Sequence, residues 1–253
     1  MSGKSEREKR RQGREQSETA AQGEERRKKL MQLAAGGVFL AIVVVVALIV
    51  INGTGSDSAG EPDAEDAGEV AQELQGIPQN GMVLGDPGAP MELVEFGDLQ
   101  CPVCKGYAEE VLPSIIENQV KNGEATLEFR NYTIIGPQSQ PAGAAALAAG
   151  EQGRGWNYVE LFYKNQGAEN SGYADDAFLK SIAKAAGVKN LAHWNKERAK
   201  LESKVEATTA EAQQLGFSGT PSFAVKGPGT KGLEPIGTPE SVEALEEALE
   251  AAF

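Results

Sequence analysis

The pattern of hydrophobic and polar positions divides the chain into four stretches. Residues 1–32 are polar, rich in Arg, Lys, Glu and Gln, and lack a hydrophobic periodicity, which is typical of a tail. Residues 33–51 are all apolar or Gly, and as a helix they would reach roughly 28 Å, enough to cross a hydrocarbon core. Residues 52–81 are small and acidic, which predicts a disordered linker. A mixed pattern of short apolar runs begins at residue 82 and predicts a folded domain over 82–253.

The charges that flank residues 33–51 predict how this stretch lies in a membrane. Four basic residues, 26–29, come immediately before it, and acidic residues follow it. The positive-inside rule therefore places the N-terminus in the cytoplasm and residues 82–253 outside the cell membrane. A cleaved signal peptide is less favoured, because the apolar stretch exceeds about 15 residues and no A-x-A pattern follows closely. A buried core helix is also less favoured, because such helices rarely lack every polar side chain.

Residues 82–253 predict an α/β fold in which helical and strand patterns are segregated. Strand patterns cover 91–96, 125–132, 222–225 and 233–236. Helical patterns cover 103–120 with a kink at Pro113, then 142–150, 156–162, 175–186, 191–215 and 239–252. A helical block this long cannot be a loop of a compact domain. We therefore predict a small mixed sheet with a helical subdomain inserted at about 139–216.

Composition and cysteine count narrow the function. The net charge is −13, and because residues 1–33 carry ten basic and six acidic residues, the remainder carries −17. An acidic body argues against nucleic-acid binding, which needs a basic surface. Two cysteines three residues apart cannot form a disulfide framework, and with one distant His193 they do not complete a four-ligand zinc site. Redox chemistry at a Cys-x-x-Cys pair is the leading interpretation.

The chemistry of the pair follows from its place at a helix start. Cys101 takes the N-cap position and Pro102 the first helical position, where a missing N–H costs nothing. A Cys101 thiolate there could accept hydrogen bonds from the N–H groups of Val103 and Cys104, so its pKa should fall to roughly 3.5–7.5. Cys104, one turn in, would resolve a mixed disulfide formed at Cys101. Two inert cysteines or a static disulfide are the alternatives, but a bridge closing so short a loop stabilises little.

Three segments together resemble the DsbA-like branch of the thioredoxin superfamily. They are Glu95-Phe96, the run Cys101-Pro102-Val103-Cys104-Lys105, and Gly216-Phe217-Ser218-Gly219-Thr220-Pro221-Ser222-Phe223. The resemblance covers about residues 82–253, and it implies a thioredoxin-like fold with an inserted helical subdomain. It further implies that Thr220-Pro221 is a cis peptide that faces the cysteines and binds an extended substrate segment.

Glu95 matches the position of a buried acid in that family, which implies proton exchange with Cys104. Because Leu93 and Val94 point to opposite faces of the strand, both faces look covered, which independently favours burial. An exposed Glu95 without a role is the alternative, and Asp98 is the less favoured substitute. Many strongly oxidising relatives place His where this chain has Val103, so we expect Pro102 and Val103 to set a moderately oxidising potential. His193 is more consistent with a packing or surface residue.

We therefore expect an extracytoplasmic thiol–disulfide oxidoreductase that oxidises cysteines of exported unfolded or reduced polypeptides. Its redox-active disulfide would be Cys101–Cys104, without a separate cofactor or metal. The resemblance implies a quinone-linked membrane partner that reoxidises it. A reductase fed with electrons across the membrane, and a redox-regulated chaperone-like anchor, are the alternatives. An isomerase is disfavoured because no dimerisation domain precedes residue 82.

Overall fold

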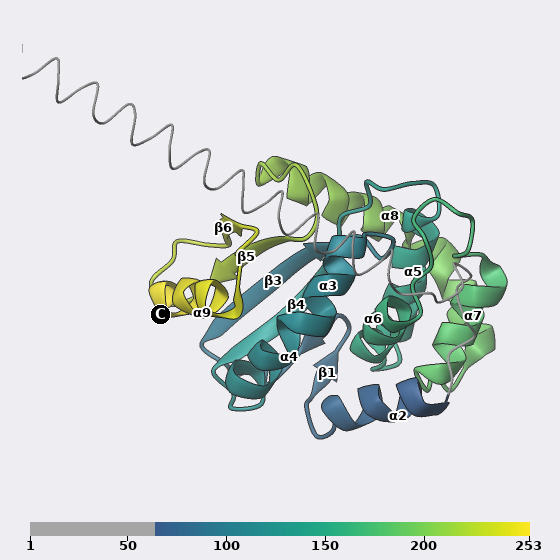
Figure 1. The fold of residues 1–253 in the computed structure, drawn as a ribbon, viewed down its shortest axis with the longest axis horizontal. Helices are drawn as coiled ribbons and strands as arrows, with labels where there is room; N and C mark the ends of the chain where they lie inside the picture. The colour runs from purple at the N-terminus through teal and green to yellow at the C-terminus, as the bar shows by residue number, and fades with distance from the viewer. Residues whose placement is uncertain (1–63) are drawn as a thin grey trace, which may run out of the picture. The chain divides into compact units, whose positions relative to one another are not determined.

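A mixed β-sheet lies at the centre of the fold, which the computed structural model describes over residues 64–253 (Figure 1). Six strands of this part of the chain form the sheet in the order β1-β2-β4-β3-β5-β6. The strands are β1 (Gln79–Asn80), β2 (Val83–Leu84), β3 (Met91–Gly97), β4 (Ala125–Asn131), β5 (Ser222–Lys226) and β6 (Glu234–Gly237). β3 is parallel to β4 and antiparallel to β5. The four strand predictions are therefore confirmed, and β1 and β2 were not predicted.

The central strand β3 is buried on both faces. Because side chains alternate along a strand, Leu93 and Glu95 face one side of the sheet, while Val94 and Phe96 face the other. All four are buried. The first side carries the larger hydrophobic core, and the second carries a smaller core that includes Ala212 of the last inserted helix. The covering of both faces brings Glu95 into the protein interior.

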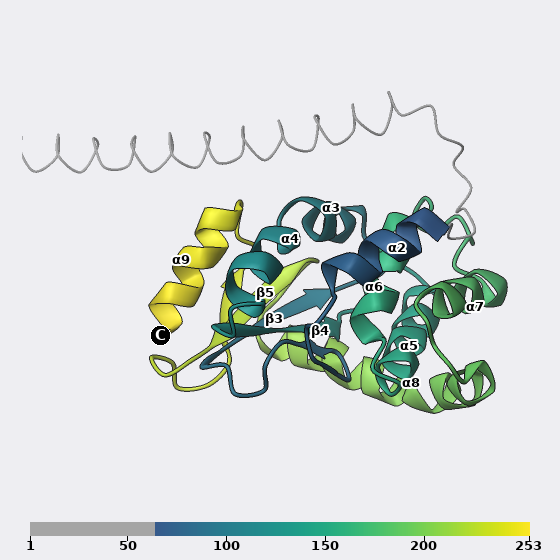
Figure 2. The ribbon, with the colours of Figure 1, turned by 90° about the horizontal axis from the view of Figure 1, so that it is seen from below.

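Helices cover the two faces of the sheet unequally. The helices α3 (Pro102–Glu110), α4 (Leu112–Ile115), the π-helical turn η1 (Ile116–Val120) and α9 (Val242–Ala252) lie on one face (Figure 2). The predicted kink in the helix after the cysteines is confirmed, although the break falls at Val111. Pro113 then occupies the first turn of α4, where a backbone N–H would have no acceptor within the helix.

The predicted helical insertion is also confirmed. It consists of α5 (Ser139–Gly150), α6 (Gly155–Lys164), α7 (Asp176–Ala185) and α8 (Leu191–Gln214), and α8 crosses the second face of the sheet. The side chains of Asp175 and Asn190 cap α7 and α8 by accepting from backbone N–H groups three residues on. Gly216 follows α8 with a φ of 84°, which suits a residue without Cβ. His193 is exposed in the first turn of α8 and takes no part in the site.

The folded domain begins earlier than predicted, so the linker prediction for 52–81 is wrong for residues 64–81. Residues Ala64–Glu73 form helix α2, which packs against α6. Val70 and Leu74 are buried. Because most residues around them are small or acidic, the sequence shows no clear hydrophobic pattern that would predict this helix. The acidic residues themselves bind α6, because Glu69 accepts from Lys164 at 2.9 Å.

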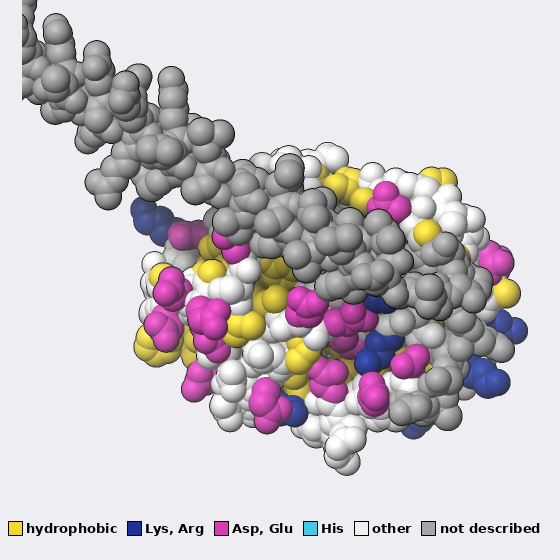
Figure 3. Space-filling model, viewed as in Figure 1, with side chains coloured by type: hydrophobic (Ala, Val, Ile, Leu, Met, Phe, Trp, Pro, Cys, Tyr) yellow, Lys and Arg dark blue, Asp and Glu magenta, His cyan; other side chains and the backbone are white. Residues whose placement is uncertain are grey.

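The remaining predictions on the N-terminal part concern residues outside those that the structure describes. They are the tail 1–32, the transmembrane segment 33–51 and the linker residues 52–63. Within residues 64–253, each helix is too short or too polar to cross a bilayer. Asp and Glu side chains are spread over the face of the domain shown in Figure 3, in keeping with the acidic composition.

Candidate active site

The two cysteines lie at the connection between β3 and α3. β3 ends at Gly97, three residues lead to Cys101 at the N-cap position of α3, and Pro102 starts the helix. The N–H of Cys101 donates to the carbonyl of Asp98 at 2.9 Å, which fixes this short connection. Both cysteines are buried free thiols in this structure. Cys101 and Cys104 therefore take the helix-start positions that the sequence predicts.

The surroundings of Cys101 favour its thiolate. The pKa of Cys101 is lowered from 9.0 to about 6, chiefly because the Cys104 thiol donates to its sulfur. Burial opposes this, while the Thr220 side chain and then the N–H groups of Cys104 and Val103 assist it. The sulfur itself donates to the Thr220 carbonyl at 3.5 Å, and no side-chain capping hydrogen bond is formed. The lowered pKa agrees with the prediction, but the main cause is the second cysteine rather than the helix end.

Cys104 is held in the opposite state. It is fully buried one turn into α3, and its pKa is raised well above 9.0. Burial is the main cause, followed by the hydrogen bond to Cys101 and the negative charges of Cys101 and Glu95. Because a thiolate rather than a thiol is the nucleophile, Cys101 is the reactive sulfur near neutral pH and Cys104 keeps its proton.

Glu95 is a buried acid behind the cysteines. It is fully buried, neither carboxyl oxygen has a hydrogen-bond partner, and its pKa is raised from 4.5 to about 8 by burial and then by Cys101. Gly97, two residues further on, leaves room for this carboxyl, since a Cβ there would lie 3.1 Å from Glu95 Oε1 and 2.6 Å from the Phe129 ring. The predicted burial is confirmed, and the raised pKa keeps the Glu95 carboxyl largely protonated at neutral pH.

Asp98 has a structural role instead. Its Oδ1 accepts from the N–H of Gln100 at 2.9 Å, and its Oδ2 accepts from the N–H groups of Ile134 and Ile135 at 2.8 and 2.9 Å. A carboxylate with both oxygens engaged by backbone donors holds two loops together. It leaves Glu95 as the carboxyl available to Cys104.

The peptide bond between Thr220 and Pro221 is cis, as the family resemblance implies. The Thr220 carbonyl faces Cys101, and the loop is held in place by the Thr238 hydroxyl, which donates to the Pro221 carbonyl at 2.6 Å. Pro102 and Val103 are exposed at the helix start, and Val103 is 50% exposed. An apolar side chain at that point adds no hydrogen-bond donor to the Cys101 thiolate.

Sequence reasoning missed the residues that tie the cysteine loop to the helical insertion. Gln166 Nε2 donates to the carbonyls of Leu99 and Cys101, at 2.7 and 3.2 Å. Tyr163 donates its hydroxyl to the Asp98 carbonyl at 3.3 Å. The donor and acceptor residues are about 65 positions apart in the sequence. A local sequence pattern therefore cannot predict these hydrogen bonds. They position the helix start by way of the inserted helices.

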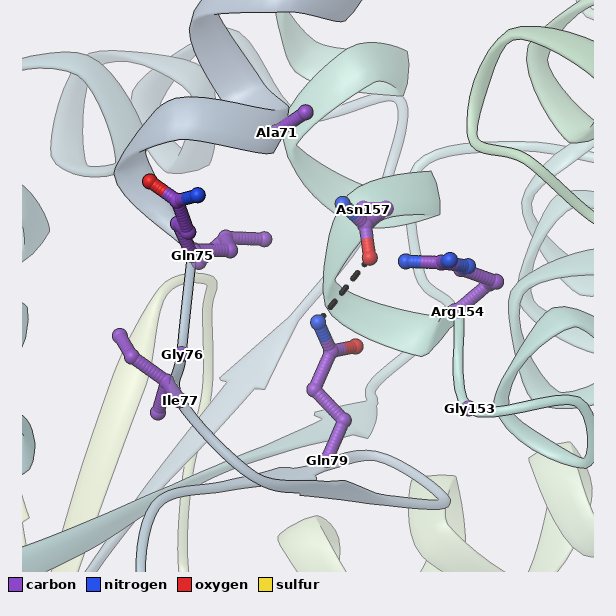
Figure 4. Close-up of a pocket in the computed structure, with 9 residues that line it drawn as sticks. Ala71, Gln75, Gly76, Ile77, Gln79, Gly153, Arg154 and Asn157 are labelled. Carbon is purple, nitrogen blue, oxygen red and sulfur yellow. Dashed lines mark hydrogen bonds between the residues drawn. The ribbon is translucent and has the colours of Figure 1, made fainter.

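Two hollows in the surface of residues 64–253 lie away from the cysteines. One of about 340 Å³ lies between α2 and α6, where Gln79 Nε2 donates to Asn157 Oδ1 at 3.0 Å beside Arg154 (Figure 4). Another of about 390 Å³ borders the loop after α2. Within residues 64–253, no group of three or more His, Cys, Asp or Glu side chains is placed to hold a metal ion.

Fold and site together define a thioredoxin-fold protein with a reactive Cys-x-x-Cys helix start. Residues 78–251 match the family model described as thioredoxin. A probable disulfide bond formation protein D of Bacillus cereus is 32% identical over 149 residues, which cover 57% of this chain and 69% of that protein. The chain therefore belongs to the thioredoxin family, and it is a thiol–disulfide oxidoreductase.

Solved structures show the same fold. The oxidised form of BdbD from Bacillus subtilis superimposes with a TM-score of 0.60 at 21% identity, covering 76% of this chain and 96% of that chain. MdbA, a thiol-disulfide oxidoreductase from Corynebacterium diphtheriae, gives a TM-score of 0.53 at 20% identity, covering 70% and 93%. These likenesses extend the fold to the inserted helices, since they span most of the described residues.

Proposed function

We propose that this protein is an oxidase that donates the Cys101–Cys104 disulfide to exported polypeptides. The unequal acidity of the two thiols carries the proposal. A Cys101 pKa of about 6 means that the reduced protein is stabilised as a thiolate at neutral pH, and an oxidising disulfide is one whose reduced form is stabilised. The names of the Bacillus relatives, disulfide bond formation protein D, support the same direction.

The proposed reaction transfers two electrons from the substrate to the enzyme, and the two substrate thiols each give up one proton to water. A substrate thiol loses its proton and attacks Cys101 Sγ, the Cys101–Cys104 bond breaks, and Cys104 leaves as a thiolate that takes a proton from Glu95. The second substrate thiol then loses its proton and attacks the substrate sulfur of the mixed disulfide, which releases the Cys101 thiolate. The substrate is oxidised to a disulfide, and the enzyme is reduced to the Cys101 thiolate and the Cys104 thiol. The backbone beside Pro221 is proposed to hold the substrate segment in an extended form during both attacks.

The reduction potential tests the direction of the reaction. The low Cys101 pKa raises the potential, whereas exposed Val103 adds no donor, so we expect a value between about −270 mV, as in thioredoxin, and about −120 mV. Equilibration with glutathione buffers, followed by thiol trapping, measures it. A potential below that of thioredoxin would contradict the oxidase and favour a disulfide reductase.

We further propose that residues 33–51 anchor the enzyme in the cell membrane with the catalytic domain outside. A quinone-linked membrane partner would then accept the two electrons from the reduced pair. The hydropathy of this stretch and the basic residues before it support the proposal.

The proposed topology is tested with protease added to intact spheroplasts. The domain of residues 64–253 should be degraded, because it is placed outside the membrane. A cytoplasmic marker protein, measured in the same samples, should survive until the membrane is disrupted. Survival of the domain until that point would overturn the extracytoplasmic placement.

A further inference from the structure

Two acidic residues occupy the same level of the interface where α2 packs against α6. The helices run antiparallel, since Asn165 Nδ2 donates to Asp66 Oδ2 at 3.2 Å and Lys164 donates to Glu69 at 2.9 Å. One turn further along α2 is Glu73, and one turn back along α6 is Glu160. The ion pair of one turn is thus followed, in the next turn, by two carboxyl groups.

Glu160 is removed from solvent without compensation, and Glu73 is half-buried. Glu160 is 4% exposed, and its Oε1 has no hydrogen-bond partner. Glu73 Oε1 is likewise buried without a partner. An uncompensated buried carboxylate is costly, so such groups hold a proton instead. A buried acid that makes no hydrogen bond contributes little to the stability of the fold. Its ability to give and take a proton is therefore the property to consider.

The charged groups around the two acids keep Glu160 protonated. Burial raises the pKa of Glu160 well above 4.5, and Glu73, Glu95 and Glu109 raise it further, while Lys164 on α6 opposes them. The pKa of Glu73 is also raised by burial and by Glu69, against the opposing charges of Lys164 and Lys121. The influence of Glu95 shows that Glu160 lies within electrostatic reach of the acid behind the cysteines.

The neighbours of Glu160 on α6 lead toward the sheet beside Glu95 on one side and toward a surface hollow on the other. On the inner side, Tyr163, one turn along α6, contacts the ring of Phe129, which pairs with Glu95 in the sheet. On the outer side, Asn157, one turn back, lines the hollow in Figure 4, as do Ala71 and Leu74 beside Glu73. Solvent therefore comes within one helical turn of the carboxyl pair.

We propose that Glu160, together with Glu73, conducts protons between Glu95 and solvent during thiol–disulfide exchange. The proposal rests on the proton exchange between Glu95 and Cys104 in the proposed function. When Cys104 leaves as a thiolate it takes the proton of Glu95, and the resulting Glu95 carboxylate regains one proton through Glu160 and Glu73 from water. On reoxidation Cys104 gives its proton to Glu95, and the same groups carry one proton outward. Glu160 acts through Glu95, so it is a positioning and relay residue rather than a catalytic one.

The test compares Glu160→Gln with Glu69→Gln in the whole protein. Glutamine is a neutral isostere of the protonated acid, so the fold should be kept, whereas it cannot pass a proton on. Glu69→Gln alters the ion pair of the same helix interface on the exposed side and serves as the matched control. The rate of disulfide reduction by glutathione is measured by rapid mixing and acid quenching. It is measured in H₂O and in D₂O, across pH 5–9.

We expect Glu160→Gln to slow the exchange by about threefold to tenfold, less than the 10²–10⁴-fold of a direct acid or base. The solvent isotope effect should rise, while the Cys101 pKa and the equilibrium with glutathione stay unchanged. Glu160→Asp, which restores a carboxyl, should recover part of the rate. The Glu69→Gln control should behave as wild type.

An unchanged rate and isotope effect in Glu160→Gln would overturn the relay. So would a slower rate accompanied by a matching change in the Cys101 pKa or in the equilibrium, because that indicates a purely structural role. The proposed oxidase is judged separately: wild-type protein that fails to oxidise a reduced substrate contradicts it, whereas a wild type that oxidises while Glu160→Gln is unaffected contradicts the relay alone.

Discussion

Replacing Cys104 with serine should trap the enzyme on its substrates. Cys101 would keep its reactive sulfur at the start of α3, but no second thiol would remain to resolve the mixed disulfide, so covalent complexes should accumulate. Replacing Cys101 with serine should abolish exchange altogether, because the remaining Cys104 is fully buried and its pKa is raised. Non-reducing gels of cells that express each variant, with thiols trapped by acid, measure both effects.

The two cysteine variants control for each other. Each variant replaces one of the two sulfurs of the Cys101–Cys104 pair by oxygen. A difference between the variants therefore shows that the two sulfurs have separate roles. Cys104→Ala, which unlike serine has no donor at this position, also removes the hydrogen bond that chiefly lowers the Cys101 pKa, so in that variant the pKa should rise from about 6 toward 9.0. Equal trapping by both variants would contradict the assignment of Cys101 as the attacked sulfur.

Replacing Glu95 with glutamine should stabilise the folded protein while slowing its chemistry. The folded-state pKa of Glu95 is about 8, so between pH 4.5 and about 8 the folded protein binds more protons than the unfolded chain. Wild-type stability from this group is therefore full below pH 4.5 and is lost as pH rises through about 8. With about 1.4 kcal/mol per pKa unit, the variant should gain roughly 4 kcal/mol over wild type at pH 8 and little at pH 4.

The same substitution removes the proton exchanged with Cys104, so exchange should slow by about a hundredfold at neutral pH. Denaturant unfolding across pH 4–9 gives the stability difference, and stopped-flow exchange with a reduced peptide gives the rate. Glu110→Gln, on the exposed end of α3, is the matched control. A stability gain that does not vary with pH would mean that Glu95 is not a buried titrating acid.

The sequence predicts the parts of the site that local patterns encode. Pro102 behind Cys101 marks a helix start, and the apolar run before it marks a strand buried on both faces, which places Glu95 inside. The cis bond at Pro221 came from family resemblance, since an X–Pro sequence alone does not determine its isomer. These predictions depend on neighbours in the chain or on a known motif, and the structure bears them out.

Long-range contacts could not be predicted in this way. Helix α2 lacks a long apolar stripe, and its acids are explained only by the partners on α6. The low pKa of Cys101 depends on how the Cys104 thiol and Thr220 are oriented, which a helix-end argument does not give. Gln166 and Glu160 have no motif around them, because their environment is assembled from distant segments.

Helix α2 also determines where the preceding chain enters the domain. Its first turn is bound to Asn165, and the adjacent Gln166 binds the Cys101 carbonyl, so the chain enters the domain beside the cysteines. With the proposed anchor ending at residue 51, twelve residues remain before Ala64, and they span at most about 40 Å. A tether this short holds a reactant at an effective concentration of about millimolar. In the anchored enzyme proposed above, such a tether would favour repeated encounters with one membrane-embedded electron acceptor, and substrates would be oxidised at the membrane surface.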